Sequence, residues 1–324
     1  MARAIFVDSP GDASVLTLRE FDPGEPAAGQ VRIAVEASGV NFIDIYQRSG
    51  LYPRPAPFVL GLEGAGRIEA VGADVSGWRA GQRVAWATIP GSYADHMVCK
   101  PDQLVAIPDA VESELAAALM LQGMTAHVLA TAVHRTQPGE TALVHAAAGG
   151  TGQLLVQELK RAGARVIGTC SSAKVELALR AGADHVISYD REEIPAEVKR
   201  LNDGRGVDVV YDSVGKNTFE ASLASLRPRG LLVLFGQASG PVPPLDLQRL
   251  NQHGSLFVTR PSLFHYIATR AELDAHAQAV LTAAQRGELR PTIAARYPLS
   301  QAKQAHLDLE GRKSAGKLLL IAGA

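Results

Sequence analysis

The middle of the chain alternates short apolar segments with amphipathic ones. Apolar residues recur at helical spacing in residues 151–162, where Leu155, Leu159 and Ala162 share one face. The pattern predicts strands at residues 141–145, 165–169, 185–189, 207–211 and 231–235, and helices at 151–162, 173–181, around 198–201 and at 217–226. Strict alternation of strand and helix is typical of a parallel sheet with helices on both faces. The expected fold class is therefore α/β, with a doubly wound domain over residues 123–261.

The first third of the chain has a different pattern. Residues 31–35 alternate apolar and polar side chains, as a half-buried strand does, and Gly and Pro recur at short intervals around them. Such a pattern predicts a compact, barrel-like β domain over residues 1–122. After residue 261 the pattern becomes helical and ends in a strand at 317–321. We expect residues 262–324 to return to the first domain.

One segment is apolar enough to be tested as a membrane span. Residues 115–134 contain no Asp, Glu, Lys or Arg. They do contain six residues poorly suited to hydrocarbon: Gln122, Gly123, Thr125, His127, Thr131 and His134. That polarity favours a pair of helices buried in a protein core over a membrane helix.

Composition narrows the function classes. Hydrophobic residues make up 47% and charged residues 20% of the 324 residues, which is typical of a globular protein. The net charge of −1 and the 5% aromatic content argue against nucleic acid or anionic lipid as partners. The two cysteines, Cys99 and Cys170, are far apart, and the N-terminus lacks a secretory signal. A cytoplasmic protein is expected.

A glycine-rich segment joins the first predicted strand of the α/β domain to its helix. Residues 145–152 read His-Ala-Ala-Ala-Gly-Gly-Thr-Gly, which places Ala147, Gly149 and Gly152 at the key positions of G-x-G-x-x-G. Gly149 would let the backbone approach a pyrophosphate, and Gly152 would let helix and strand pack closely. A plain glycine-rich turn is the alternative interpretation.

The end of the second strand selects the cofactor. NAD-binding domains usually carry an Asp or Glu there, whereas residues 168–174 contain Ser171, Ser172 and Lys174 and no acid. Hydroxyls and an ammonium suit a 2′-phosphate, so NADPH (NADP+) is favoured over NADH. Lys174 could instead be a solvated helix residue. Tyr189 could flank the same phosphate or be an aromatic residue at the sheet edge.

Several ordered motifs carry a family resemblance that spans nearly the whole chain. Residues 61–84 contain a glycine-punctuated signature that resembles the medium-chain dehydrogenase/reductases. Residues 41–44, 48–53, 145–152, 211–215, 254–256 and 259–261 resemble the zeta-crystallin-like quinone oxidoreductases. The resemblance implies a GroES-like β-rich catalytic domain, a Rossmann domain, and an interdomain cleft that holds NADPH.

The resemblance also implies which residues contact the cofactor. Asn41 and Asp44 would lie near the nicotinamide end, Thr125 and His127 would approach the cofactor, and Phe235, Gly236, Gln237 and Ser239 would wrap the nicotinamide. Gly149 and Gly150 would hold the pyrophosphate, and Gly152 belongs to the same cofactor-binding loop. Val214 would lie close to the adenine-side ribose, Ser171, Lys174 and Tyr189 around the 2′-phosphate, and Arg312 near the phosphates. The sequence departs from many relatives at His127 and Gln237, where Tyr and Asn are frequent.

No metal is expected. Zinc-dependent relatives use an early Cys, a Gly-His-Glu motif and a cluster of four cysteines. Here the Cys site resembles the stretch around Asn41, Leu62 replaces the His, and the cysteine cluster is absent. A catalytic zinc needs about three protein ligands. We therefore expect a zinc-independent enzyme.

Substrate chemistry is expected in residues 41–53. Tyr46, Tyr52 and Asn41 are the candidate catalytic residues, because a hydroxyl or amide could hydrogen-bond a carbonyl oxygen as charge develops there. Both tyrosines could instead be packing aromatics. Asp44 is expected to accept backbone N–H groups rather than to move protons, Glu63 to be a salt bridge or turn anchor, and His306 an ordinary core or surface residue.

Three functions stay open on this sequence. The first is an NADPH-dependent quinone oxidoreductase, which transfers hydride from NADPH to a quinone without zinc. The second is an NADPH-dependent enone or 2-alkenal double-bond reductase, and the third is a non-catalytic NADPH-binding protein. The resemblance further implies a homodimer formed through sheet edges, with residues 256–258 as the expected edge.

Overall fold

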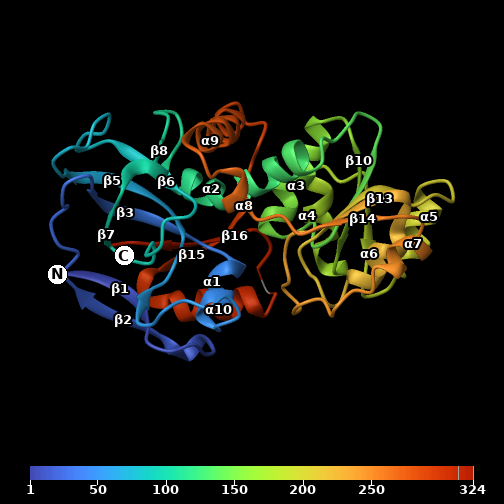
Figure 1. Cartoon of the computed structure of the whole chain (residues 1–324), viewed down its shortest axis with the longest axis horizontal. Helices are drawn as coiled ribbons and strands as arrows, with labels where there is room; N and C mark the ends of the chain where they lie inside the picture. The colour runs from blue at the N-terminus through green and yellow to red at the C-terminus, as the bar shows by residue number, and fades with distance from the viewer. Residues whose placement is uncertain (313, 324) are drawn as a thin grey trace. The chain divides into compact units, whose positions relative to one another are not determined.

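The computed structural model describes residues 1–312 and 314–323. The chain forms two compact units (Figure 1). Unit 1 consists of Met1–Met124 and Ile267–Ala324, and unit 2 of Thr125–Tyr266. Unit 2 is thus inserted between two segments of unit 1.

Unit 1 is rich in strands. Its strands are β1 (Ala2–Val7), β2 (Leu16–Phe21), β3 (Val31–Val40), β4 (Phe58–Val59), β5 (Glu63–Val71), β6 (Arg83–Trp86), β7 (His96–Cys99), β8 (Val105–Ala106), β15 (Ile293–Pro298) and β16 (Lys317–Ile321). Its helices are α1 (Phe42–Arg48), α9 (Arg270–Gln285), α10 (Ala302–Glu310) and the first part of α2 (Ser113–Val128). Single 3-10 turns are Ala13–Val15, Pro101–Gln103 and Leu299–Gln301.

Two sheets build this unit. A small sheet has the order β2-β1-β4, and a larger one the order β15-β16-β3-β5-β6-β8, with β7 also paired to β3. The alternation predicted for residues 31–35 is confirmed, because Val31, Ile33 and Val35 are buried in the core beneath the larger sheet. β16 pairs antiparallel with β3, with Leu318 opposite Val40. The end of the chain therefore returns to the first sheet, as expected.

Unit 2 alternates strands and helices. Its strands are β9 (Thr141–Val144), β10 (Arg165–Cys170), β11 (His185–Ser188), β12 (Val207–Asp212), β13 (Leu226–Leu234) and β14 (Phe257–Thr259). Its helices are α3 (Gly150–Arg161), α4 (Val175–Arg180), α5 (Ile194–Leu201), α6 (Phe219–Ser225), α7 (Gln248–Gln252) and α8 (Leu263–Tyr266), with a 3-10 turn at Ser172–Lys174.

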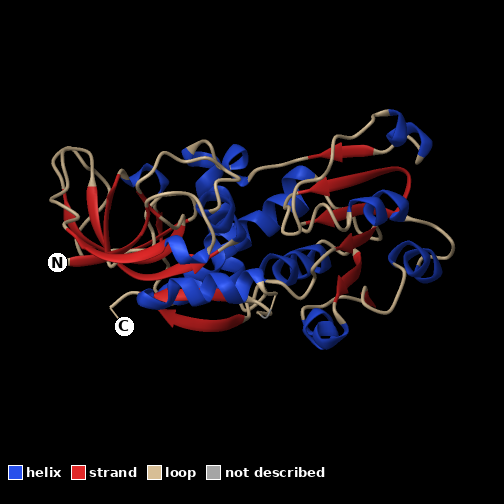
Figure 2. Ribbon diagram, turned by 90° about the horizontal axis from the view of Figure 1, so that it is seen from below, coloured by secondary structure: helices blue, strands red, loops and turns tan. Residues whose placement is uncertain are grey.

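The six strands of unit 2 form one parallel sheet. Their order is β11-β10-β9-β12-β13-β14, and every pairing is parallel. This is the Rossmann order, in which the direction of winding reverses between the first and fourth strands. Helix α3 packs beside α4, and α5 beside α6, with helices on both faces of the sheet (Figure 2). The predicted doubly wound sheet is confirmed.

The strand expected at residues 231–235 begins earlier than predicted. β13 begins at Leu226, directly after α6, and runs through these residues. Its register against β12 jumps from Val207 opposite Leu226 to Val209 opposite Leu231, so the intervening residues form a bulge. Pro228 is tolerated there because a bulged residue donates no ladder hydrogen bond.

The predicted helix pair at residues 115–134 is wrong. α2 runs on without a turn into a π-helical segment, Leu129–Val133. This segment, Ser113–Val133, is long and apolar enough to cross a membrane by length and composition, but 61% of its apolar window is buried inside the protein. Such burial is typical of a core helix.

Candidate functional site

The glycine-rich segment forms the connection between β9 and α3. Gly149 precedes the first helical residue, Gly150. A Cβ on Gly152 would lie 2.2 Å from the carbonyl oxygen of Ala146, so close packing requires glycine there, as predicted. A Cβ on Gly149 would meet one atom only, at 3.1 Å. Gly149 and Gly150 are only partly buried at the N-terminus of α3, which is where a pyrophosphate binds in this fold.

The alanine at the first motif position is balanced by a glycine in the neighbouring strand. Ala147 is fully buried. A Cβ on Gly168, in β10, would lie 2.7 Å from the Ala147 Cβ. Ala147 therefore fits because Gly168 lacks a side chain, and the tight connection is made by two strands together.

A buried hydrogen-bond chain lies under this connection. His145 follows β9 and is fully buried; its Nδ1 is 3.0 Å from Thr169 Oγ1 and its Nε2 is 3.0 Å from Ser222 Oγ. The Ser222 hydroxyl donates to Asp212 Oδ2 at 2.8 Å, so it accepts from a protonated His145 Nε2, and Thr169 donates to Nδ1. Burial lowers the pKa of His145, which keeps the ring neutral.

This chain of hydrogen bonds ends at Asp212, whose carboxylate also organises the next two loops. Its Oδ1 accepts the backbone N–H groups of Val214 and Gly215 at 2.8 and 3.0 Å, and the Thr218 hydroxyl lies 2.8 Å from both carboxylate oxygens. Both oxygens of this buried carboxylate thus have donors. The loop after β12 is thereby fixed at the carboxyl end of the sheet.

The loops after β12 and β13 are joined to each other. The Ser239 hydroxyl and backbone N–H both donate to the carbonyl oxygen of Val214, at 2.7 and 2.8 Å. A Cβ on Gly236 would lie 2.4 Å from the carbonyl oxygen of Ser213, so this approach requires glycine. Phe235 and Gln237 belong to the same half-buried loop. The structure therefore brings Val214 together with the predicted segment 235–239.

The residues predicted to surround a 2′-phosphate also gather at one place. Cys170 pairs with Ser188, so Ser171 and Lys174 after β10 lie beside Tyr189 after β11. Tyr189 is 48% exposed. The acidic residue Asp190 also lies here, which the linear sequence did not suggest. Its carboxylate accepts the backbone N–H and the hydroxyl of Ser172 at 2.9 and 2.6 Å. These bonds lower the pKa of Asp190 and direct its carboxylate onto Ser172.

Thr125 and His127 lie in the last part of α2 and are half-buried. His127 Nδ1 lies 3.6 Å from Glu158 Oε1 of α3. This places His127 beside the helix that begins at the glycine-rich segment.

In unit 1, Asn41 is the centre of a second polar cluster. It precedes α1 and is buried. Its Nδ2 donates to Glu63 Oε2 at 2.8 Å and to the carbonyl oxygen of Gly39 at 3.2 Å, and its Oδ1 accepts from Lys317 Nζ at 2.9 Å and Gln122 Nε2 at 3.0 Å. The amide uses its two donors and two acceptor positions within the protein. Asn41 therefore has a structural role here, because its side chain holds these residues together.

Glu63 and Lys317 form an ion pair with no exposed side-chain surface. Glu63 Oε1 also accepts the backbone N–H of Leu121 at 2.5 Å. The predicted salt-bridge role of Glu63 is confirmed. A Cβ on Gly39 would lie 2.7 Å from Lys317 Nζ and still closer to Glu63, so the pair depends on glycine at this point of β3.

These residues do not fit a zinc ion. The Glu63 carboxylate is held by an ammonium, an amide and a backbone N–H group, and the neighbouring Leu62 is buried and apolar. Over residues 1–312 and 314–323, no group of three or more His, Cys, Asp or Glu side chains is arranged to hold a metal. A catalytic zinc requires about three such ligands.

A second chain of hydrogen bonds ends at Asp44, one helical turn from Asn41. Its Oδ2 accepts the backbone N–H of Asn41 at 2.8 Å and the Tyr93 hydroxyl at 3.0 Å. His306 Nε2 lies 3.2 Å from that hydroxyl, and Arg48 Nη1 lies 3.1 Å from His306 Nδ1. Asp44 does accept a backbone N–H, as expected. Its link to α10 was not predicted.

Tyr46 and Tyr52 pack against each other. Their ring centroids are 5.1 Å apart in an edge-to-face arrangement, and Tyr46 also contacts Phe42. Tyr46 is 8% exposed and Tyr52 half-buried. Arg312 is exposed in the turn after α10, with a positive φ of 54°.

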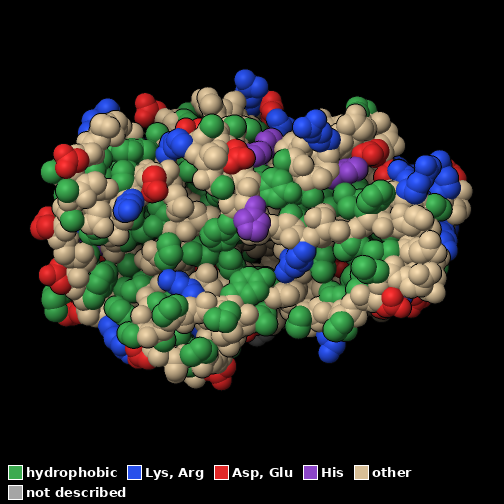
Figure 3. All heavy atoms as spheres, in the orientation of Figure 1, with side chains coloured by type: hydrophobic (Ala, Val, Ile, Leu, Met, Phe, Trp, Pro, Cys, Tyr) green, Lys and Arg blue, Asp and Glu red, His purple; other side chains and the backbone are tan. Residues whose placement is uncertain are grey.

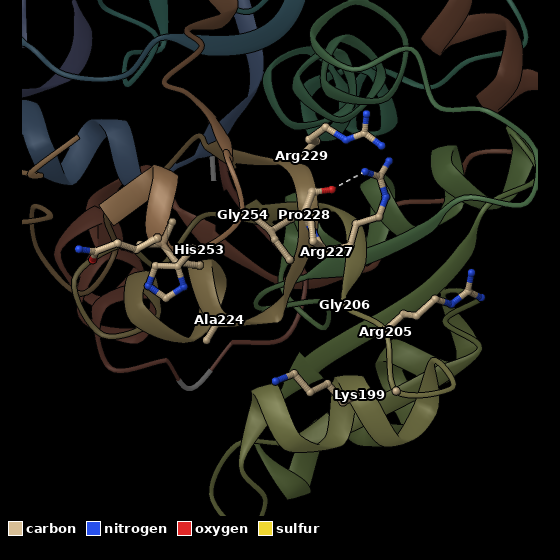
Figure 4. Close-up of a pocket in the computed structure, with 13 residues that line it drawn as sticks. Lys199, Arg205, Gly206, Ala224, Arg227, Pro228, Arg229, His253 and Gly254 are labelled. Carbon is tan, nitrogen blue, oxygen red and sulfur yellow. Dashed lines mark hydrogen bonds between the residues drawn. The ribbon is translucent and has the colours of Figure 1, made fainter. Parts of the chain in front are cut away.

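A cavity of about 820 Å³ lies elsewhere in unit 2 (Figure 4). It is formed at the amino ends of β12, β13 and β14, and its charged lining consists of Lys199, Arg205, Arg227, Arg229 and His253. Figure 3 shows Lys and Arg side chains near α5 on the face it presents.

The basic lining of this cavity has a structural reason. Helices α5, α6 and α7 all end beside it, and cations stabilise the negative ends of helices. Arg227 is paired with Asp208 at 2.6 Å. Ligands of open α/β sheets bind at the carboxyl ends of the strands. This cavity lies at the opposite edge of the parallel sheet from the cofactor residues predicted in unit 2.

The chain is similar to known proteins in both of its domains. Residues 27–109 match the alcohol dehydrogenase GroES-like domain, and residues 150–276 match the zinc-binding dehydrogenase domain. A quinone oxidoreductase of Pseudomonas aeruginosa is 45% identical over 99% of this chain and 100% of its own length. The chain belongs to the quinone oxidoreductase family. The resemblance seen in its motifs and the expected GroES-like and Rossmann domains are confirmed.

Two further relatives place the chain within this group. The structure of Escherichia coli quinone oxidoreductase complexed with NADPH has a TM-score of 0.96 and 42% identity, covering 98% of this chain and 99% of that one. A 2-haloacrylate reductase of Burkholderia is 38% identical over 99% of both chains. One domain match bears a zinc-binding name, but the residues of this member do not fit zinc, as shown above.

The sequence did not suggest four residues of these clusters: Tyr93, Asp190, His306 and Lys317. Each reaches its cluster through a contact distant in sequence. Tyr93 is 49 positions from Asp44, and Lys317 is 254 positions from Glu63. The one local signal was Lys317 itself, a charged residue opening an otherwise apolar strand.

Proposed function

We propose that the protein is an NADPH-dependent quinone oxidoreductase that acts without zinc. The observation that carries this proposal is the 45% identity over the whole chain with a quinone oxidoreductase. The partly buried helix N-terminus at Gly149 and Gly150 and the hydroxyls and ammonium after β10 fit a phosphorylated dinucleotide. When bound, NADPH supplies the hydride.

Each cofactor residue has a proposed role. Gly149 and Gly150 hold the pyrophosphate, and Gly152 shapes the cofactor-binding loop by letting helix and strand pack closely. Ser171, Lys174 and Tyr189 hold the 2′-phosphate, and Val214 the adenine-side ribose. Phe235, Gly236, Gln237 and Ser239, with Asn41, Asp44, Thr125 and His127, serve the nicotinamide end, and Arg312 adds charge for the phosphates. Lys174 favours NADPH because its ammonium attracts a phosphate. Asp190 works against this choice because its hydrogen bonds from Ser172 lower its pKa and keep it negatively charged, although both of its oxygens are held on Ser172.

Tyr46 and Tyr52 are the proposed substrate-binding residues. Their edge-to-face packing fixes two phenol rings in one short segment of unit 1. A hydroxyl held there orients a quinone carbonyl and stabilises negative charge on its oxygen. Asn41 contributes by fixing the start of α1, because both donors and both acceptor positions of its side-chain amide are used in hydrogen bonds within the protein.

A second candidate function is reduction of an activated C=C bond. The similarity to a 2-haloacrylate reductase favours it. Both reactions transfer hydride from the same cofactor, so the fold does not separate them.

We further propose a cytoplasmic homodimer. Two buried, free cysteines are consistent with a reducing compartment. β14 is the last strand of the parallel sheet, and its Phe257 is 60% exposed. An exposed apolar edge strand is suited to pairing with a second copy. A monomeric mass in light scattering would refute the dimer.

The test is steady-state oxidation of NADPH and NADH, each with 1,4-benzoquinone and with a 2-alkenal, in the presence of a chelator. The proposal expects rapid quinone reduction that prefers NADPH and survives the chelator. Faster turnover of the alkenal would favour the second function. NADPH binding without turnover of either acceptor would show a non-catalytic NADPH-binding protein.

A further inference from the structure

The hydrogen bonds that lead to Asp44 run in a single direction. Arg48 has no acceptor atom, so its Nη1 donates to His306 Nδ1, and the ring proton of neutral His306 is on Nε2. That N–H donates to the Tyr93 oxygen, and the Tyr93 hydroxyl donates to Asp44 Oδ2. Burial and the nearby Arg48 lower the pKa of His306 to about 3, which keeps it neutral at physiological pH.

This direction determines where a proton on Asp44 must sit. Both donors, the Asn41 N–H and the Tyr93 hydroxyl, converge on Oδ2. A proton bound by the carboxyl group is therefore carried on Oδ1. Among the described residues, Oδ1 is buried and has no hydrogen-bond partner. Because Asp44 has no exposed surface, an acceptor on a bound molecule reaches this O–H group only when the side chains that cover it move aside.

The charges around Asp44 make both of its states accessible near neutral pH. Arg48 lies on its own helix, Arg54 follows that helix, Tyr93 faces it from the β6–β7 connection, His306 and Glu310 from α10, Glu63 from β5 and Lys317 from β16. Burial dominates and raises the pKa of Asp44 to about 7, against the lowering effects of Asn41, Tyr93 and Lys317.

We propose that Asp44 holds the proton that completes quinone reduction and delivers it from Oδ1. The inference rests on the proposed quinone oxidoreductase function. Hydride addition to a quinone leaves a hydroquinone monoanion, which needs one proton. The Asp44 O–H bond breaks, the proton joins the anionic oxygen to give the hydroquinone, and the Asp44 carboxylate takes a proton from water before the next turnover. Tyr46, a proposed quinone-binding residue, lies on the same helix.

Tyr93 and His306 are positioning residues in this scheme. They hold Oδ2 in hydrogen bonds and so direct the transferable proton to Oδ1. Removing the Tyr93 hydroxyl takes one donor from the carboxylate form, which should hold its proton more tightly.

The experiment measures kcat for benzoquinone reduction with saturating NADPH from pH 5 to 9. The wild-type rate should fall about tenfold per pH unit above an inflection near pH 7, as Asp44 loses its proton. Asp44→Asn, which is nearly isosteric, should be about 100-fold slower at pH 6 and show no inflection. Tyr93→Phe should keep the inflection and move it up by about one pH unit.

A control variant and a second readout separate the possible failures. Asp109→Asn removes a fully exposed carboxylate of the same unit and should leave the profile unchanged. NADPH affinity is measured for each variant, and all rates are compared at NADPH concentrations that saturate that variant. If Asp44→Asn does not fold, the shift in Tyr93→Phe still decides the matter, and an unshifted profile overturns the proposal.

Asp44→Asn with the wild-type rate and pH profile would refute the proton step while leaving quinone reduction intact. A wild-type protein that binds NADPH and reduces no quinone would refute the proposed function, and the proton step with it.

Discussion

Each unit contains a buried chain of hydrogen bonds that passes through a neutral histidine and a hydroxyl to a buried carboxylate. In unit 2, His145 and Ser222 lead to Asp212. In unit 1, His306 and Tyr93 lead to Asp44. The two chains have the same direction, because in each the histidine carries its proton on Nε2.

The chains differ in what else reaches the carboxylate. Both oxygens of Asp212 accept hydrogen bonds, from two backbone N–H groups and two hydroxyls. Asp44 has two donors, both on Oδ2, and among the described residues nothing on Oδ1. A buried carboxylate is stable as an anion only when donors replace the lost water. Asp212 has a donor for each of its oxygens, whereas Asp44 leaves one of its oxygens without a donor.

The largest effect on stability is expected at Asp212, the carboxylate with a donor on each oxygen. Asp212→Asn replaces an acceptor by an NH₂ group that faces existing donors. We expect the free energy of unfolding to fall by about 3–5 kcal/mol, and by a similar amount at pH 5 and pH 8. Urea denaturation at both values of pH measures it. A loss of unfolding free energy below about 1 kcal/mol would contradict the comparison, because the hydrogen bonds to Asp212 would then contribute little to stability.

Asp44→Asn should behave in the opposite way. The folded protein holds the Asp44 proton more tightly than the unfolded chain, since the pKa is about 7 against 3.8. The stability contributed by the protonated carboxyl is complete below about pH 4 and is lost as the pH rises to 7. Relative to wild type, the variant should therefore gain about 2–4 kcal/mol in unfolding free energy between pH 5 and pH 8. A difference that does not vary with pH would contradict the assigned pKa.

Ser222→Ala tests the hydroxyl between histidine and carboxylate. It removes one donor from Asp212, which keeps three others, and leaves the His145 Nε2–H without its acceptor. The expected cost is about 1–2 kcal/mol, measured by denaturant unfolding. Ser222→Thr keeps the hydroxyl and serves as the matched variant. An equal loss in both would point to packing rather than to the hydrogen bond.

Lys174→Met should have the smallest effect on stability, because this side chain is half-buried at the sheet edge and outside both chains. We expect the unfolding free energy to change by less than about 0.5 kcal/mol. The KM for NADPH should rise about tenfold, while the KM for NADH stays unchanged. A parallel rise for both cofactors would show that Lys174 does not read the 2′-phosphate.

Local periodicity was sufficient to predict the parallel sheet, because each strand and helix of unit 2 has its own apolar spacing. It was also sufficient for Gly152, whose packing depends on residues six positions away or fewer. It failed at residues 226–230, where Pro228 and Gly230 separated the predicted helix from the predicted strand. There the strand continues through a bulge, and only the pairing of β12 with β13 shows this.

The polar clusters were less accessible from the sequence. Asn41, Asp44 and Glu63 were identified through family resemblance, but their partners come from distant segments. Nothing in the residues around His306 distinguishes it from His265, although His306 is fully buried and His265 is exposed. Which ionisable groups share a buried space is decided by tertiary packing, and a linear pattern does not encode that neighbourhood.

The ion pair between Glu63 and Lys317 also bears on the order of events during synthesis. Glu63 is made early and would be buried without a counter-charge until Lys317 leaves the ribosome, since β16 carries that ammonium into the sheet beside β3. All segments of unit 2 are made before β16. We therefore expect the parallel sheet to be completed while the first-made unit still waits for its last strand.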